Sequence, residues 1–367
     1  MEMTHAKQAA PAAAAMTTRE AAIRLLEGDT RPWAEGEPFT VRFYQPEDGY
    51  GVARLIYAVY GNGYPIDTFY IPEQLTEENR AGRIKSVVAR TSSGEVICHF
   101  SLHRSSAPNP DMYEAGLGLT HPAYRACGAF ERCFTLLFSL VENNSVTAIF
   151  GEAVCNHTIT QKMAEPAKLV ETALEVDLMP ADTYAKERAS DGRVSCLMYF
   201  RIGADQRRPL YIPDCYAAEI RFMMEGITLK RELLGSSGSQ PLPADSELQT
   251  ESFSSSGVCR CSIIRPGQDL AGRLAALEDD LRSRGYALLE CFVPLGVPEA
   301  AYSVAALRTA GFFLGGFLPC WFGDDGLLML KLFGTAGFDS IKLFSERGKA
   351  IMAMVRADWV RACSHGR

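Results

Sequence analysis

A short segment near residue 125 combines an arginine, a glycine and the start of a helix. Residues 125–130 read Arg-Ala-Cys-Gly-Ala-Phe, and apolar residues at helical spacing follow. A helix start directs unpaired N–H groups and about half a positive charge to one point, which suits a pyrophosphate. Gly128 has no Cβ to hold a ligand away, and Arg125 adds a charge for phosphate oxygens. We therefore expect a pyrophosphate to contact the backbone or side chains of Arg125, Ala126, Cys127, Gly128, Ala129 and Phe130.

Two glycines lie in the strand that we expect just before this loop, at residues 112–119. Glycine weakens a strand, so Gly116 and Gly118 indicate a bulge or a close approach to the backbone. Tolerated small residues are the alternative here. For the loop, the alternative is an ordinary tight connection between a strand and a helix.

The hydrophobic pattern predicts that alternating strands and helices hold this segment in place. In the first half, strands are expected at residues 40–44, 85–90, 95–102, 112–119, 146–150, 169–176 and 195–202, and helices at 51–60, 72–83, 129–143 and 156–167. In the second half, helices are expected at 214–225, 270–281, 298–310 and 340–362, and strands at 259–264, 287–293, 312–318 and 327–333. Residues 235–257, rich in Ser, Gly and Pro, are expected to form a loop. The order of elements in the second half echoes the first, which suggests an internal duplication.

The run of strand, His121-Pro122, Arg125-x-x-Gly128, helix, short strand and further helix resembles the GNAT superfamily of N-acyltransferases. In that family a Q/R-x-x-G-x-G/A loop binds the pyrophosphate of coenzyme A; here Phe130 replaces the last small residue. The resemblance covers residues 40–203 and implies an α/β fold whose mixed, mostly antiparallel central sheet is flanked by helices. Residues 306–316, "ALRTAGFFLGG", resemble the family's closing helix and Gly-Phe turn. We therefore expect an N-terminal tail and helix (1–39), a GNAT domain (40–205) and a degenerate GNAT-like copy (206–367).

The resemblance implies an acyl-CoA-dependent N-acyltransferase, with acetyl-CoA or another acyl-CoA as cosubstrate. A primary amine, on a small molecule or a peptide, would attack the thioester directly. The backbone of Leu117, Gly118 and Leu119 would face the acyl-pantetheine arm, and one N–H would polarise the thioester carbonyl. A donor of this kind contributes about 2.7–4 kcal/mol to transition-state stabilisation.

The attacking amine must lose a proton, because an alkylamine with a pKa near ~10.4 is mostly protonated at neutral pH. Members of the family that use a glutamate base on this strand imply Glu114, with His121 and His103 as other candidates. The family often has a tyrosine on the helix after the short strand, as the acid for the leaving thiolate. No tyrosine lies at residues 156–167; Asn156 and His157 could act there, although Asn156 also fits a helix N-cap.

Composition argues against several other functions. The net charge is −7, and no basic stripe is present, so nucleic-acid binding is not expected. No apolar run approaches the ~18–20 residues of a membrane span. The 11 cysteines form no ligand pair at zinc spacing, so we expect no metal and a reducing, cytoplasmic setting.

Two other functions remain open from the sequence. One is a catalytically degenerate GNAT-like protein that binds acyl-CoA or acts as a scaffold, which Phe130 and the missing tyrosine favour. The other is an aminoacyl-tRNA-dependent transferase, which the negative net charge disfavours. The second half could close the acceptor pocket or form the surface of a homodimer.

Overall fold

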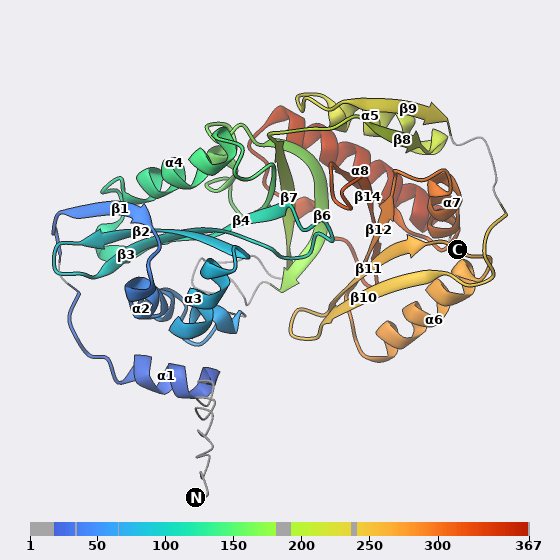
Figure 1. Ribbon diagram of the computed structural model, residues 1–367. Helices are drawn as coiled ribbons and strands as arrows, with labels where there is room; N and C mark the ends of the chain where they lie inside the picture. The colour runs from blue at the N-terminus through green and yellow to red at the C-terminus, as the bar shows by residue number, and fades with distance from the viewer. Residues whose placement is uncertain (1–17, 34, 65, 181–191, 236–240, 366–367) are drawn as a thin grey trace, which may run out of the picture. The chain divides into compact units, whose positions relative to one another are not determined.

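The computed structural model of the chain describes residues 18–33, 35–64, 66–180, 192–235 and 241–365 (Figure 1). Its contacts divide the chain into two compact units. The first unit holds Met1–Phe100 with Gly118–Cys133, and the second holds Ser101–Leu117 with Phe134–Arg367. The boundary therefore passes through strands β3 (Val96–His103) and β4 (Met112–Thr120) and through helix α4 (Ala129–Glu142). The predicted domains at 40–205 and 206–367 stay a prediction.

The first unit packs helices against a small antiparallel sheet. Its elements are α1 (Arg19–Glu27), β1 (Phe39–Phe43), α2 (Gly49–Tyr60), α3 (Pro72–Arg80), β2 (Ile84–Thr91) and the first part of β3. Strand β1 runs antiparallel to β2, with Phe39 opposite Thr91. Helix α3 packs against both α2 and β2 (Figure 1). The strands and helices predicted for this region are confirmed, with small shifts at their ends.

The second unit is built on a long mixed sheet. Its order is β4-β5-β7-β6-β13-β14-β12-β11-β10, where the new strands are β5 (Ala148–Val154), β6 (Val170–Pro180), β7 (Arg193–Ile202), β10 (Glu247–Phe253), β11 (Val258–Arg265), β12 (Leu288–Pro294), β13 (Phe313–Leu318) and β14 (Gly326–Leu332). Within this order, β4–β5 and β11–β12 are parallel and the other pairs are antiparallel. The predicted fold class, an α/β fold with a mixed, mostly antiparallel sheet flanked by helices, is confirmed.

The sheet of the second unit repeats one topology. Across the sheet, the strands β4-β5-β7-β6 are followed by β13-β14-β12-β11. Read from the far end, the second set is β11-β12-β14-β13, which has the same pattern as the first set. Each set begins with a parallel pair, β4–β5 or β11–β12. The two series meet where Gly316 of β13 lies opposite Ala173 of β6. This is the arrangement that an internal duplication would produce.

The same sheet curls strongly. Four strands separate β5 from β12 in the sheet order, which would place them about 24 Å apart in a flat sheet. The indole of Trp321 nevertheless lies 5.1 Å from the ring of Phe150 on β5 and 5.1 Å from that of Phe292 on β12. The strands must therefore bend around a shared interior, as in a barrel.

Helices and a strand pair complete the second unit. The helices are α5 (Ala217–Met224), α6 (Leu270–Ser283), α7 (Ala300–Thr309) and α8 (Glu346–His365), and β8 (Arg208–Ile212) runs parallel to β9 (Arg231–Gly235). Helix α8 packs on β13 and β6 (Figure 1). It begins later than the predicted residue 340, after the short 3-10 helix η7 (Phe338–Ser340).

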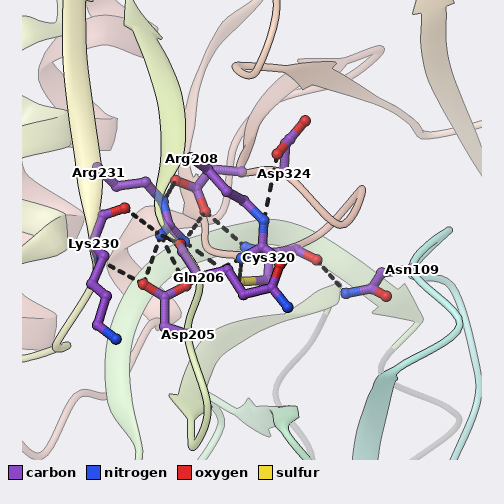
Figure 2. A network of polar contacts seen from close by, with 9 residues as sticks. Asn109, Asp205, Gln206, Arg208, Lys230, Arg231, Cys320 and Asp324 are labelled. Carbon is purple, nitrogen blue, oxygen red and sulfur yellow. Dashed lines mark hydrogen bonds and ion pairs between the residues drawn. The ribbon is translucent and has the colours of Figure 1, made fainter.

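A buried polar network fastens β9 to the turn before β14 (Figure 2). The guanidinium of Arg231 is buried; it lies 2.8 Å from Asp205 and donates to Asp325 Oδ1 at 2.9 Å. Asn109 Nδ2 donates to the Cys320 carbonyl at 2.8 Å. Removing one member of such a network would leave an uncompensated buried charge.

Two predicted elements are wrong. Residues 235–257 were expected to form a loop, but they include β10, an edge strand of the described sheet that pairs with β11 and whose side chains are mostly exposed. Residues 156–167 were expected to form a helix, but only the 3-10 helix η4 (Gln161–Met163) is present. Pro166 disfavours helical backbone just before it, and the Gln161 side chain instead donates to the Lys342 carbonyl at 2.8 Å.

Among the described residues, no helix is both long enough and apolar enough to cross a lipid bilayer.

Candidate functional site

The predicted pyrophosphate loop lies in the first unit and makes two sharp turns. It connects the 3-10 helix η3 (Pro122–Tyr124) to α4, and both Ala126 (φ +64°) and Gly128 (φ +80°) have left-handed backbone. A side chain strains this conformation, so at Ala126 it costs about 1–2 kcal/mol. A Cβ added to Gly128 would meet no atom within 4 Å. Glycine is therefore favoured at this position by its left-handed backbone and not by lack of space, and the space beside it is open. A strained, open turn at a helix start is typical of ligand-binding loops.

The amides of the loop are only partly used by the protein. The N–H of Arg125 donates to the Pro122 carbonyl at 3.3 Å, and that of Cys127 donates to the Tyr124 carbonyl at 3.4 Å. Within the described ranges, no acceptor is recorded for the amides of Gly128 and Ala129. They lie at the start of the 14-residue helix α4, where backbone N–H groups lack partners in their own helix. Two adjacent donors are thus available to an anion.

Phe130 explains one of the strand glycines. A Cβ on Gly118 would lie 2.7 Å from Phe130 Cε2 and 3.0 Å from Phe100 Cδ2. The two rings pack together, with centroids 5.4 Å apart. Glycine at position 118 is therefore required by the aromatic packing within the first unit. The large residue that departs from the family's loop pattern is accommodated because β4 has no side chain at this point.

Strand β4 has irregular backbone near its middle. It pairs with β5 at Met112, Tyr113 and Glu114, and the recorded pairing ends there, whereas β5 continues beside β7 to Val154. Leu117 then has φ +54°, which is unusual for a branched residue and marks a bulge. Ala115 still lies beside β5, because its carbonyl oxygen is 3.5 Å from the position that a Cβ on Gly151 would occupy, so the irregularity of β4 lies at Leu117.

Glu114 is held by a histidine. Its Oε2 lies 3.5 Å from His103 Nε2, and Gly116 leaves room for the imidazole because a Cβ there would lie 3.0 Å from His103 Cε1. Burial favours the neutral acid, but His103 outweighs it and lowers the pKa of Glu114 to about 2. Burial lowers the pKa of His103, but Glu114 outweighs that and the net pKa is raised. A carboxylate of such low pKa is a weak proton acceptor near neutral pH.

His121, which directly follows β4, makes its contacts within the first unit. The ring of His121 stacks on Trp33 at 4.0 Å, and its Nδ1 accepts from the Ala123 N–H at 3.3 Å. Burial, and then the charge of Arg54, lowers the pKa of His121. These contacts give His121 a packing role, and its role as a base stays a prediction.

Asn156 belongs to the second unit and caps no helix, because residues 156–160 form bends and turns before η4. Its Oδ1 is buried and has no hydrogen-bond partner among the described residues. The neighbouring Cys155 is buried, which raises the pKa of its thiol to about 12. A thiol of this pKa is not a ready nucleophile.

The sequence did not single out a second group of ionisable residues, here called the acidic cluster: Glu152 of β5, Glu175 of β6, Glu290 of β12 and Arg260 of β11. The guanidinium of Arg260 lies 3.3 Å from Glu152, 3.1 Å from Glu175 and 2.8 Å from Glu290. The curled sheet brings these four strands together. Each glutamate interrupts an apolar strand ("AIFGEAV", "TALEVDL", "LLECFVP"), and such buried charges are the signal that could have revealed the cluster.

Two carboxyl groups of the acidic cluster have raised pKa values. Burial raises the pKa of Glu152 to about 7; Arg260 opposes this increase, and Glu114 and Glu290 add to it. Burial and then the charges of Glu152 and Glu290 hold the pKa of Glu175 well above its usual value. Strongly shifted carboxyl groups are frequent where proteins bind or transform ligands.

A group of His, Cys, Asp or Glu side chains that could hold a metal ion does not occur in the described part of the chain.

Comparison with known proteins gives similarity to solved structures alone. No family model matches the chain, and no curated protein matches it. The ribosomal-protein-S5-alanine acetyltransferase of Vibrio fischeri is 12% identical, and 47% of this chain aligns with 97% of that one at a TM-score of 0.36. An acetyltransferase of the GNAT family from Staphylococcus aureus Mu50 is 13% identical, over 46% of this chain and 100% of its own, with a TM-score of 0.32. A Salmonella typhimurium protein solved with its cofactor acetyl-CoA is 11% identical, over 46% and 96%, at 0.37.

Proposed function

We propose that the chain is an acyl-CoA-dependent N-acyltransferase that transfers an acetyl or other acyl group to a primary amine. The observation that carries this proposal is the turn at residues 125–129. Two left-handed residues place the amides of Gly128 and Ala129 at the start of α4 without recorded acceptors among the described residues. Arg125, exposed beside them, supplies the positive charge that a diphosphate requires.

The backbone of β4 supports binding of the acyl-pantetheine arm of the same cosubstrate. Leu117 has left-handed backbone (φ +54°), so the strand departs from regular geometry directly before Gly118 and Leu119. An acyl-pantetheine arm can bind beside such a strand through main-chain hydrogen bonds. One N–H there would polarise the thioester carbonyl, as a preorganised donor does for an oxyanion.

The first experiment measures coenzyme A binding to the full chain by isothermal titration calorimetry. The variant Arg125→Ala removes a charge-assisted contact, so we expect about tenfold weaker binding, equivalent to about 1.4 kcal/mol. Arg80→Ala is the matched control, because Arg80 is an exposed arginine of the same unit, on α3. Coenzyme A that fails to bind at millimolar concentration would refute the proposal.

Turnover is tested separately. Acetyl-CoA with a panel of primary amines should release free thiol, which a thiol reagent detects. Binding of acetyl-CoA without thiol release across the panel would instead identify a degenerate, acyl-CoA-binding protein.

A further inference from the structure

Residues 29–33 and 35–37, here called the brace segment, contact the 3-10 helix η3 that precedes the pyrophosphate loop. The indole of Trp33 stacks on the imidazole of His121, with ring centroids 4.0 Å apart and an angle of 19° between the planes. The Glu37 N–H donates to the hydroxyl oxygen of Tyr124 at 3.4 Å. His121 is the cap residue of η3 and Tyr124 is its last residue, so the loop follows directly. All of these residues belong to the first unit.

The second face of the Trp33 indole is covered as well. Arg54 Cζ lies 4.0 Å from the centroid of the indole. Two groups this close to one ring centroid would overlap if they shared a face, so the indole lies between the guanidinium of Arg54 and the imidazole of His121. Both contacts are favourable for tryptophan, one with a cation and one with an aromatic ring.

Arg54, which belongs to α2, is itself held firmly. Its side chain is 8% exposed, and its Nε lies 3.2 Å from Asp29. Its Nη1 donates to Glu95 at 2.7 Å, and its Nη2 donates to the carbonyl of Arg31. A buried guanidinium with partners on each side is costly to move. Helix α2 and the turn before β3 therefore fix the position of Trp33.

Further contacts connect the stack to the loop. His121 Nδ1 accepts from the Ala123 N–H at 3.3 Å, and the His121 carbonyl accepts from the Tyr124 N–H at 2.9 Å. The Tyr124 carbonyl accepts in turn from the Cys127 N–H at 3.4 Å. Between them lies Ala126, whose left-handed backbone is strained. Strained backbone persists only where the surrounding structure holds it, and the brace segment supplies such support.

The brace segment is an addition to the region that carries the family resemblance, because it precedes residue 40. Trp33 does not belong to the buried core of the first unit. It is half-buried and borders a cavity of about 460 Å³. Replacing it should therefore change the stack with His121 and leave the core intact.

We propose that Trp33 is a positioning residue: stacked between Arg54 and His121, it holds the pyrophosphate loop in the shape that binds the diphosphate of coenzyme A. This inference rests on the function proposed above. In this role Trp33 acts through His121, without touching the cosubstrate. A loop already held in its bound shape loses less conformational freedom on binding, so the ligand binds more tightly. The gain cannot exceed the free energy of the stack, which for an aromatic pair corresponds to about two- to tenfold in affinity.

Hydrogen exchange followed by mass spectrometry tests the positioning of the loop without any ligand. Trp33→Ala removes the stack, so the amides of residues 124–130 should exchange at least about fivefold faster, while those of β2 keep their rate. Trp33→Phe retains an aromatic ring and should keep exchange in the loop slow. Phe43→Ala, at an exposed aromatic position of the same unit, is the matched control and should leave the loop unchanged.

Two results of the exchange experiment would overturn the proposal. One is an unchanged rate in the loop of Trp33→Ala. The other is faster exchange throughout the first unit in both Trp33→Ala and His121→Ala, which would mean that the stack supports the whole unit and has no particular effect on the loop.

Calorimetry then relates the loop to the cosubstrate. Coenzyme A should bind Trp33→Ala about five- to tenfold more weakly than the unmodified chain, and Trp33→Phe within about twofold of it. His121→Ala removes the other half of the stack. The double variant of Trp33→Ala and His121→Ala should bind no more weakly than the weaker single variant, because both changes remove the same contact. Losses that simply add would contradict a shared role.

The two proposals can fail separately. No binding of coenzyme A to the unmodified chain would reject the acyltransferase, and exchange in the loop would still decide whether Trp33 positions it. Equal binding of coenzyme A to the unmodified chain and to Trp33→Ala would reject the positioning role and leave the acyltransferase standing.

Discussion

Replacing Glu152 by glutamine should stabilise the chain at high pH. This is the opposite of the destabilisation that usually follows the loss of a buried ion-pair partner. Burial raises the pKa of Glu152 from 4.5 to about 7 in the folded chain. A carboxyl group with a raised pKa takes up a proton on folding, so its contribution to stability falls as the pH rises through this interval. At about 1.4 kcal/mol for each pH unit, ionised Glu152 destabilises the fold by about 3 kcal/mol at pH 8.

The assay is urea unfolding at pH 5 and pH 8, with Glu346→Gln as the exposed control. Glu152→Gln should be near the unmodified chain at pH 5, where Glu152 is already protonated. At pH 8 the variant should gain up to about 3 kcal/mol, and its stability should depend less steeply on pH. A variant that is equally affected at both pH values, or that is less stable at pH 8, would refute this account of the cluster.

Three further changes probe other parts of the structure. Arg231→Met leaves the buried Asp325 without its cation, whereas Asp205 keeps Arg208, so unfolding in urea should show a loss of about 3–5 kcal/mol. Gly118→Ala places a Cβ 2.7 Å from the Phe130 ring, so it should cost about 1–3 kcal/mol, and adding Phe130→Ala should remove part of that cost in a double-mutant cycle. Glu114→Gln removes the charge that raises the pKa of His103, so NMR titration should show the histidine pKa falling.

Each of these has an outcome that would contradict it. A stable Arg231→Met protein would mean that the buried network of Figure 2 contributes little. Additive effects of the two changes at Gly118 and Phe130 would mean that the ring does not restrict position 118. An unchanged His103 titration would mean that its pairing with Glu114 is not formed in solution.

The loop could be predicted because its determinants are local. The helix start at Ala129 and the apolar face of α4 depend on neighbouring residues and were expected from a stretch of fewer than 20 positions, whereas the left-handed backbone of Gly128 was not predicted. The parallel neighbours β4 and β5 also follow from a strand, a helix and a second strand in succession. The catalytic roles of Glu114, His121 and Asn156 remain predictions.

The acidic cluster could not be assembled from the sequence. Glu290 lies opposite Arg260 on the adjacent strand, but only the curl of the sheet brings Glu152 of β5 and Glu175 of β6 within 3.3 Å of Arg260. Nor could the low pKa of Glu114 be expected, because it depends on His103, eleven positions earlier on a separate strand.

The sequence alone determined most of the alternation of strands and helices and the glycine-containing turn before α4, because turn chemistry and hydrophobic period act over a few residues. Tertiary structure alone decided which carboxyl groups share a buried space, which are ionised, and that Phe130 rests on Gly118. Those properties depend on burial and on distances between residues far apart in the chain, and a linear pattern does not contain them.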